Sequence, residues 1–209
     1  MSVAHKPIGI VRAQYPRKLS PRPVPGQAYL QPAIEAMARV HAERNRAVFA
    51  LTAPHRRAGT TYVVNLLAAE LVRQFECTVA IVPPEALKGS DPGRLPQGFT
   101  EDSPGVWSAV PDKALEQLPD FALENIWISR GAADFDFVLI DCPALTSNSF
   151  AARFAYTVDG MFLVVEAGVT KVQQIRAAAR SLTGTGSHLH GIVLNRRTYP
   201  IPKALYQLL

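Results

Sequence analysis

A short loop holds the residues best suited to bind a phosphate. It reads, from residue 53 to residue 61, Ala-Pro-His-Arg-Arg-Ala-Gly-Thr-Thr, and apolar segments flank it on both sides. Glycine lets a backbone close around a phosphate, successive amides point at its oxygens, and the helix that follows adds the positive end of its dipole. The loop therefore predicts a phosphate site formed by the backbone and side chains of residues 56–62.

The loop departs from the eight-residue pattern of a P-loop at two positions. Pro54 stands at the first glycine, Gly59 at the second, Thr60 at the lysine and Thr61 at the hydroxyl that ligates magnesium. The nearby pair 56–57, two arginines, has two interpretations. The arginines form a solvated loop tip, or they replace the lost lysine charge, because arginine binds phosphate in bidentate fashion.

A second candidate is Asp141, which ends the apolar run FDFVLIDC at residues 135–142. A carboxylate at the carboxyl end of a parallel strand is placed to orient the water of a bound magnesium ion. The alternative is a turn or helix-capping residue. We therefore expect Thr61 and Asp141 as the metal-binding residues, with Asp141 also the catalytic candidate.

The elements around these residues alternate. Apolar runs predict strands at 47–53, 77–82, 135–142, 160–167 and 189–195, and helical periodicity predicts helices at 31–45, 60–75, 120–131 and 170–182. Residues 85–119 predict mostly loop, with a short strand at 105–110. Alternating strands and helices predict a doubly wound parallel sheet in a three-layer α/β/α domain with a P-loop NTPase-like fold.

Three stretches of the chain resemble the bacterial tyrosine kinases of capsule and exopolysaccharide biosynthesis. They read AVFALTAPHRRAGTTYVVNLLA, FDFVLIDCPAL and DGMFLVVEAGVTKVQQIRAAARSL, the last continuing to HGIVLNRR. The family's loop usually ends Pro-Gly-Glu-Gly-Lys-Ser-Thr-Thr. The resemblance implies ATP or ADP with Mg²⁺ as cofactors. It places Asp141 at the acid that holds magnesium through water, and Asn195 and Arg196 at positions that contact adenine in relatives. The nucleotide-binding candidates are Arg56, Arg57, Ala58, Gly59, Thr60, Thr61, Tyr62, Asn195 and Arg196.

Departures from the family pattern favour impaired catalysis. Thr60 removes the lysine, Pro83 replaces the first acid after the second strand, and the phosphorylated tyrosine tail is reduced to Tyr199 and Tyr206. The resemblance thus implies a degenerate kinase that regulates a membrane-bound polysaccharide copolymerase or export protein. Alternatives are an active tyrosine kinase or ATPase of the same family, and a positioning ATPase like the septum-site and chromosome-partition proteins. Homo-oligomers are also expected from the resemblance.

Charge and composition divide the chain into residues 1–28, a basic proline-rich arm, and residues 29–209, one P-loop-like domain. The net charge of +5 comes from five basic residues that precede the first acid, Glu35. The folded part is therefore balanced, which argues against nucleic-acid binding. We expect a cytoplasmic protein, at the inner face of the membrane through its partner, with Cys77 and Cys142 as buried thiols.

Overall fold

A computed structural model describes residues 28–83, 99–109, 135–147, 151 and 158–196. The basic arm, the helix predicted at 120–131 and the two tail tyrosines lie outside the described residues, so these calls stay predictions. Among the helices that the structure describes, none is long and apolar enough to cross a bilayer.

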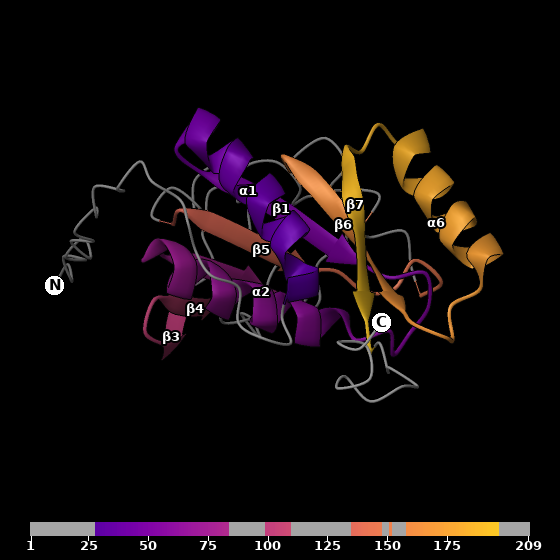
Figure 1. Cartoon of the computed structure of the whole chain (residues 1–209), viewed down its shortest axis with the longest axis horizontal. Helices are drawn as coiled ribbons and strands as arrows, with labels where there is room; N and C mark the ends of the chain where they lie inside the picture. Colours follow the sequence, from indigo (N-terminus) through magenta and orange to yellow (C-terminus); the bar gives the residue numbers. More distant parts are fainter. Residues whose placement is uncertain (1–27, 84–98, 110–134, 148–150, 152–157, 197–209) are drawn as a thin grey trace, which may run out of the picture.

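The described strands form one sheet of seven, in the order β3-β4-β2-β5-β1-β6-β7 (Figure 1). Their bounds are Ala47–Thr52 for β1, Val79–Val82 for β2, Phe99–Ser103 for β3, Val106–Ala109 for β4, Phe137–Asp141 for β5, Gly160–Glu166 for β6 and Leu189–Asn195 for β7. Every pairing from β4 to β7 is parallel. The central strand β1 is buried along its whole length, as an apolar strand covered on both faces requires.

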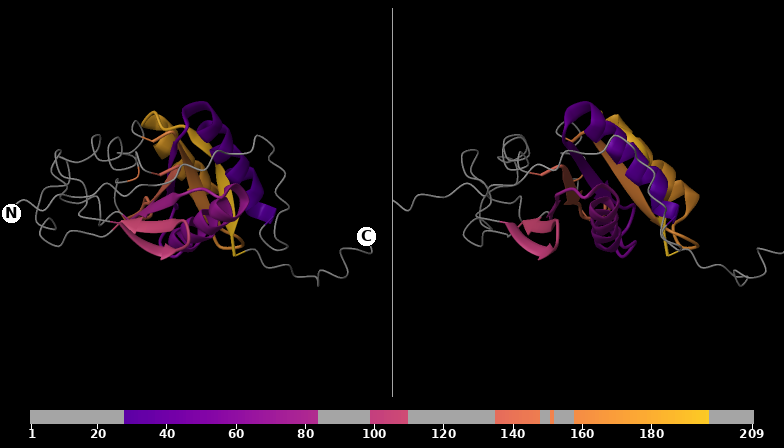
Figure 2. Two further views of the ribbon diagram at one scale, coloured as in Figure 1. Left: turned by 90° about the vertical axis from the view of Figure 1, so that its left-hand side faces the viewer. Right: turned by 60° about the vertical axis from the view of Figure 1, so that its left-hand side comes forward.

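The edge strand β3 was not predicted from the sequence, and it pairs antiparallel with β4. Its sequence, FTEDS, is mostly exposed and carries no apolar alternation that would mark a strand. Tertiary contacts define the turn instead. Gly105 has φ +81°, and a Cβ there would lie 2.8 Å from Val72 Cγ1. The sheet is therefore mixed at this edge, and Figure 2 shows the β3–β4 hairpin at the end away from α6.

The described helices cover both faces of the sheet. They are η1 (Ala28–Leu30), α1 (Gln31–Arg44), α2 (Thr60–Phe75) and α6 (Val172–Gly184). Alternate residues of β1 face opposite sides: Phe49 packs in the cluster that holds α1 and α2, whereas Ala50 packs in the cluster that holds α6. The predicted three-layer α/β/α arrangement is confirmed.

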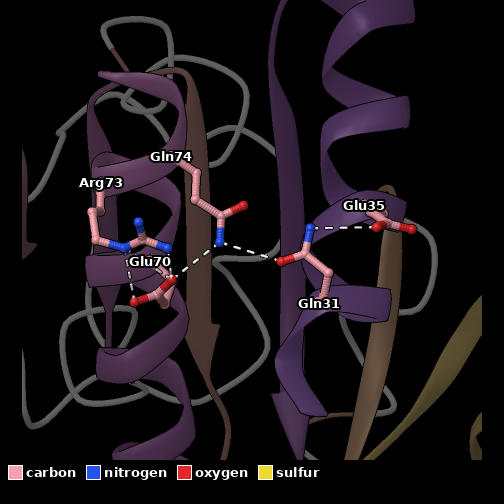
Figure 3. A network of polar contacts seen from close by, with 5 residues as sticks. All are labelled: Gln31, Glu35, Glu70, Arg73 and Gln74. Carbon is pink, nitrogen blue, oxygen red and sulfur yellow. Dashed lines mark hydrogen bonds and ion pairs between the residues drawn. The ribbon is translucent and has the colours of Figure 1, made fainter. Parts of the chain in front are cut away.

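A polar network joins α1 to α2 at the outer surface of this layer (Figure 3). Glu70 is only 5% exposed and accepts hydrogen bonds from Arg73 Nη2 at 2.6 Å and Gln74 Nε2 at 3.0 Å. Gln74 Nε2 also donates to Gln31 Oε1 of α1 at 3.3 Å. The hydrogen bond from Arg73 is the largest cause that holds the pKa of Glu70 below its ordinary value. Burial of this carboxylate is thus compensated by its partners.

Parallel pairing places the ends of β1, β5, β6 and β7 at one edge of the sheet. The residues at these ends are Thr52, Asp141, Glu166 and Asn195. Leu51 and Asp141 are direct neighbours in the register of β1 and β5. The loop that follows β1 therefore emerges beside the other three strand ends, which is where a doubly wound sheet binds its ligands.

Candidate phosphate site at the carboxyl edge of the sheet

The loop between β1 and α2 has the backbone conformation of an anion-binding turn. Gly59 is the N-cap of α2 with φ +89°, and Arg57 also has positive φ, at +68°. Alternation of right- and left-handed residues turns successive amides to one side and forms a concave nest for an anion. The first turn of α2 adds amides that have no partner within the helix. The geometry therefore fits a phosphate group.

Arg57 stands where the kinase pattern Pro-Gly-Glu-Gly has its first glycine. A left-handed conformation is unfavourable for a residue with a Cβ, by roughly 1–2 kcal/mol. The observed φ of +68° shows that the loop keeps the glycine-like conformation with arginine in its place. Side chains of Arg56 and Arg57 are both exposed. Arg56 Nε donates to Ser147 Oγ at 2.9 Å, in the segment after β5.

Two oxygen ligands meet at the mouth of the loop. Thr61 Oγ1 donates a hydrogen bond to Asp141 Oδ2 at 2.6 Å, although the residues are 80 positions apart. Thr61 is exposed and Asp141 is half-buried, so both can be reached from solvent. Hydroxyl and carboxylate oxygens are the ligands that Mg²⁺ prefers, so the donor set fits this ion. The structure thus brings together the two residues that the sequence suggested for the metal.

His55 connects the loop to the turn that follows β6, a contact that sequence reasoning missed. Its Nδ1 lies 2.8 Å from the Arg56 carbonyl oxygen, and its Nε2 lies 2.8 Å from Thr170 Oγ1. A carbonyl can only accept, so Nδ1 carries the proton and Nε2 accepts from the threonine hydroxyl. Thr170 Oγ1 in turn accepts from the Glu166 amide at 3.0 Å. No spacing signal could reveal a pair 115 positions apart.

Asn195 and Arg196 lie beside the loop, at the end of β7. Asn195 is 2% exposed, and its Nδ2 donates to the Ala58 carbonyl at 2.8 Å. Arg196 Nη1 lies 2.9 Å from Glu166 Oε1 in an ion pair, and more than half of the arginine side chain is exposed. Both residues predicted for adenine thus lie at the loop, and their contact with a base stays a prediction.

The remaining candidates occupy the first turn of α2 and the residue before it. Ala58 is buried at 1% exposure, Thr60 is half-buried, and Tyr62 is 61% exposed. At the lysine position, Thr60 offers a hydroxyl and no charge. The loop therefore supplies the backbone and metal-side oxygens of a P-loop without its lysine.

Cysteine and histidine chemistry at this edge is limited. Cys77 and Cys142 are both buried free thiols, as predicted. Burial, reinforced by the neighbouring Asp141 charge, raises the pKa of Cys142 far above its ordinary value, so the thiol stays protonated and unreactive. Within the part of the chain that the structure describes, no three His, Cys, Asp or Glu side chains gather as a metal site.

Comparison with known proteins supports the resemblance seen in the sequence. The chain is 30% identical over 91 residues to "Tyrosine-protein kinase CpsD" of Streptococcus agalactiae serotype III (strain NEM316), a match covering 42% of this chain and 39% of the relative. The match therefore spans about two fifths of the relative's length. No family model matches the sequence.

Solved structures of bacterial kinase domains share the fold. The BceF tyrosine kinase domain superposes with a TM-score of 0.60 at 22% identity, covering 77% of this chain and 73% of that one. The VpsO kinase domain gives 0.60 at 19% identity, covering 82% and 97%. Cobyrinic acid a,c-diamide synthase from Mycobacterium smegmatis, solved with an ATP analog and magnesium, gives 0.56 at 16%, covering 73% and 77%. The expected resemblance to bacterial tyrosine kinase domains and the P-loop NTPase-like fold are both confirmed.

Proposed function

We propose that this chain is a kinase-like P-loop domain that binds nucleotide phosphates weakly, transfers phosphate poorly, and regulates a membrane-bound polysaccharide copolymerase or export protein. The observation that carries the proposal is the contact of Thr61 with Asp141 beside a loop that keeps P-loop geometry but has Thr60 at the lysine position. Similarity to kinase domains supports the biological role.

Each loop residue has a separate role in the proposed site. The backbone at Ala58–Tyr62 binds phosphate oxygens, and Gly59 allows the close approach. Thr61 and Asp141 hold Mg²⁺, which when bound neutralises phosphate charge. Asn195 and Arg196 lie on the side assigned to the base. Such a site can hold ATP or ADP without performing efficient chemistry.

Impaired catalysis follows from the missing charge. Phosphoryl transfer is stabilised mainly by cations placed at the outer phosphates, and a threonine hydroxyl cannot supply one. Pro83 follows β2 where the kinases have an acid, which removes a second part of the phosphate machinery. The loss of two parts favours a regulatory binding module over an active kinase.

An active enzyme of the same family is the alternative, and it requires an arginine in place of lysine. Arg56 is already engaged with Ser147, whereas Arg57 is exposed and lies two residues before Gly59. Arg57 is therefore the better candidate to reach the outer phosphates. A positioning ATPase is the weaker alternative, because those proteins use a lysine early in the loop and residues 53–57 contain none.

Calorimetric titration with ATP and ADP, with and without Mg²⁺, tests the proposal. We expect weak binding that Arg57→Ala reduces about ten- to a hundredfold, since a charge-assisted contact contributes roughly 1.5–3 kcal/mol. Gly59→Val should abolish binding, and Thr60→Ala should change it little. The charge-restoring variant Thr60→Lys should strengthen it. Absence of binding in both the parent and Thr60→Lys would contradict a nucleotide-binding role.

A partner test addresses the regulatory role separately. Cells that carry the Thr60→Ala variant should export polysaccharide as the parent does, because the proposed function does not depend on phosphate transfer. Deletion of the whole domain should change the amount or chain length of the polymer. Equal polymer in the parent and the deletion strain would exclude the proposed role.

A further inference from the structure

Asn195 uses nearly all of its polar groups to join three elements. Its side-chain Nδ2 donates to the Ala58 carbonyl at 2.8 Å, its Oδ1 accepts from the Arg196 amide at 2.9 Å, and its backbone carbonyl accepts from the Ala167 amide at 2.9 Å. The residue is 2% exposed. A side chain so buried and so fully bonded has little left to offer a base, and its contacts point to the loop itself.

The bond to Ala58 fixes the direction of the next amide. In a trans peptide the carbonyl of one residue and the N–H of the following residue point in opposite directions. Because Asn195 draws the Ala58 carbonyl toward β7, the Gly59 amide must point away from β7. This orientation is the one an anion-binding nest needs, since the amide is then free to meet a phosphate oxygen.

The same side chain also determines which residue can follow Ala58. A Cβ added to Gly59 would lie 2.2 Å from Asn195 Nδ2, far inside any normal contact. The amide of Asn195 and the glycine therefore fit together, and the loop is held from below at the point where it turns into α2.

We infer that Asn195 is a positioning residue that holds the 53–61 loop in its phosphate-binding conformation, acting through the Ala58 peptide and not mainly through the nucleotide base. The inference rests on the proposed phosphate site for its ligand, while the conformational effect on the loop exists without any ligand. It assigns to Asn195 a role in affinity for the phosphate part of the ligand.

The variant Asn195→Asp removes the amide donor at nearly constant volume, and Asn65→Asp is its matched control. Asn65 Nδ2 also donates to a backbone carbonyl, that of Thr61 at 2.8 Å, but from the exposed surface of α2. Amide hydrogen exchange then reports on the loop in the full chain. The Val63 amide donates to the Gly59 carbonyl at 3.1 Å and the Leu145 amide to the Ala53 carbonyl at 2.9 Å.

We expect exchange of these two amides to become about tenfold faster in Asn195→Asp, the effect of losing one buried hydrogen bond. Asn65→Asp should leave both unchanged. The Asp159 amide, which donates to Val48 at the opposite edge of the sheet, is the internal reference. If Asn195→Asp exchanges at the parental rate at Val63 and Leu145, or accelerates Asp159 equally, the positioning role is wrong.

Ligand titrations separate positioning from base contact. Tripolyphosphate carries the phosphates alone, adenosine the base alone, and ATP both. A positioning residue predicts that Asn195→Asp weakens tripolyphosphate and ATP by the same factor. Loss of ATP affinity with unchanged tripolyphosphate affinity would assign Asn195 to the base and overturn the inference. If the parent binds none of the three, the proposed phosphate site fails, whereas the exchange rates still decide whether Asn195 holds the loop.

Discussion

Replacement of Gly59 by alanine tests the loop geometry directly. Two costs apply. The residue has φ +89°, which costs a residue with a Cβ roughly 1–2 kcal/mol. The new Cβ would also lie 2.2 Å from Asn195 Nδ2, and overpacking of this kind costs about 1–3 kcal/mol. We therefore expect Gly59→Ala to lose about 2–5 kcal/mol of unfolding free energy.

Gly168→Ala is the control that isolates the backbone cost. Gly168 has φ +74°, but no atom lies within 4 Å of the position that its Cβ would take. Thermal unfolding of both variants measures the difference, and for a domain of this size each kcal/mol lowers the midpoint by about 2–4 °C. Gly168→Ala should fall by roughly 2–8 °C and Gly59→Ala by clearly more. Equal shifts would refute the argument that the loop is packed closely against Asn195.

Four further predictions concern other parts of the molecule. Deletion of residues 1–28 should leave the thermal midpoint almost unchanged, because the prolines and charges of the arm disfavour a packed element; a large drop would show that the arm packs on the domain. Purified protein should incorporate little phosphate at Tyr199 or Tyr206, and robust labelling in mass spectrometry would contradict impaired catalysis. The lowered pKa of Glu70, caused first by its arginine hydrogen bond, means that its stabilising effect is present above the ordinary glutamate pKa of about 4.3 and is lost as pH falls toward the lowered value. Glu70→Gln should thus reduce the acid dependence of the midpoint, and an unchanged slope would exclude this carboxylate as its source. Burial lowers the pKa of His190, so the folded state resists its protonation and stability should fall as pH decreases below about 6.5; His190→Phe should flatten this part of the profile, and an identical profile would show that another group titrates there.

Much of the fold could be predicted because its signals are local. The helix expected at 60–75 begins and ends where α2 does, since its apolar periodicity is unbroken and the glycine before it favours the N-cap conformation. The central strands were found because both faces are buried and their sequences are continuously apolar. Strand β3 escaped because a mostly exposed edge strand carries no such pattern.

The sequence by itself determined which chemical groups are available at the loop: one glycine, two hydroxyls, two arginines and no lysine. Residue types decide charge and ligand preference whatever the fold, so the impaired catalysis could be argued from Thr60 alone. Tertiary structure decided how these groups meet. The bonds of Thr61 to Asp141, of His55 to Thr170 and of Asn195 to Ala58 join residues 80, 115 and 137 positions apart. Parallel pairing of β1, β5, β6 and β7 brings the ends of these strands to one edge, and no local pattern in a single sequence specifies which side chains will then lie within hydrogen-bonding distance.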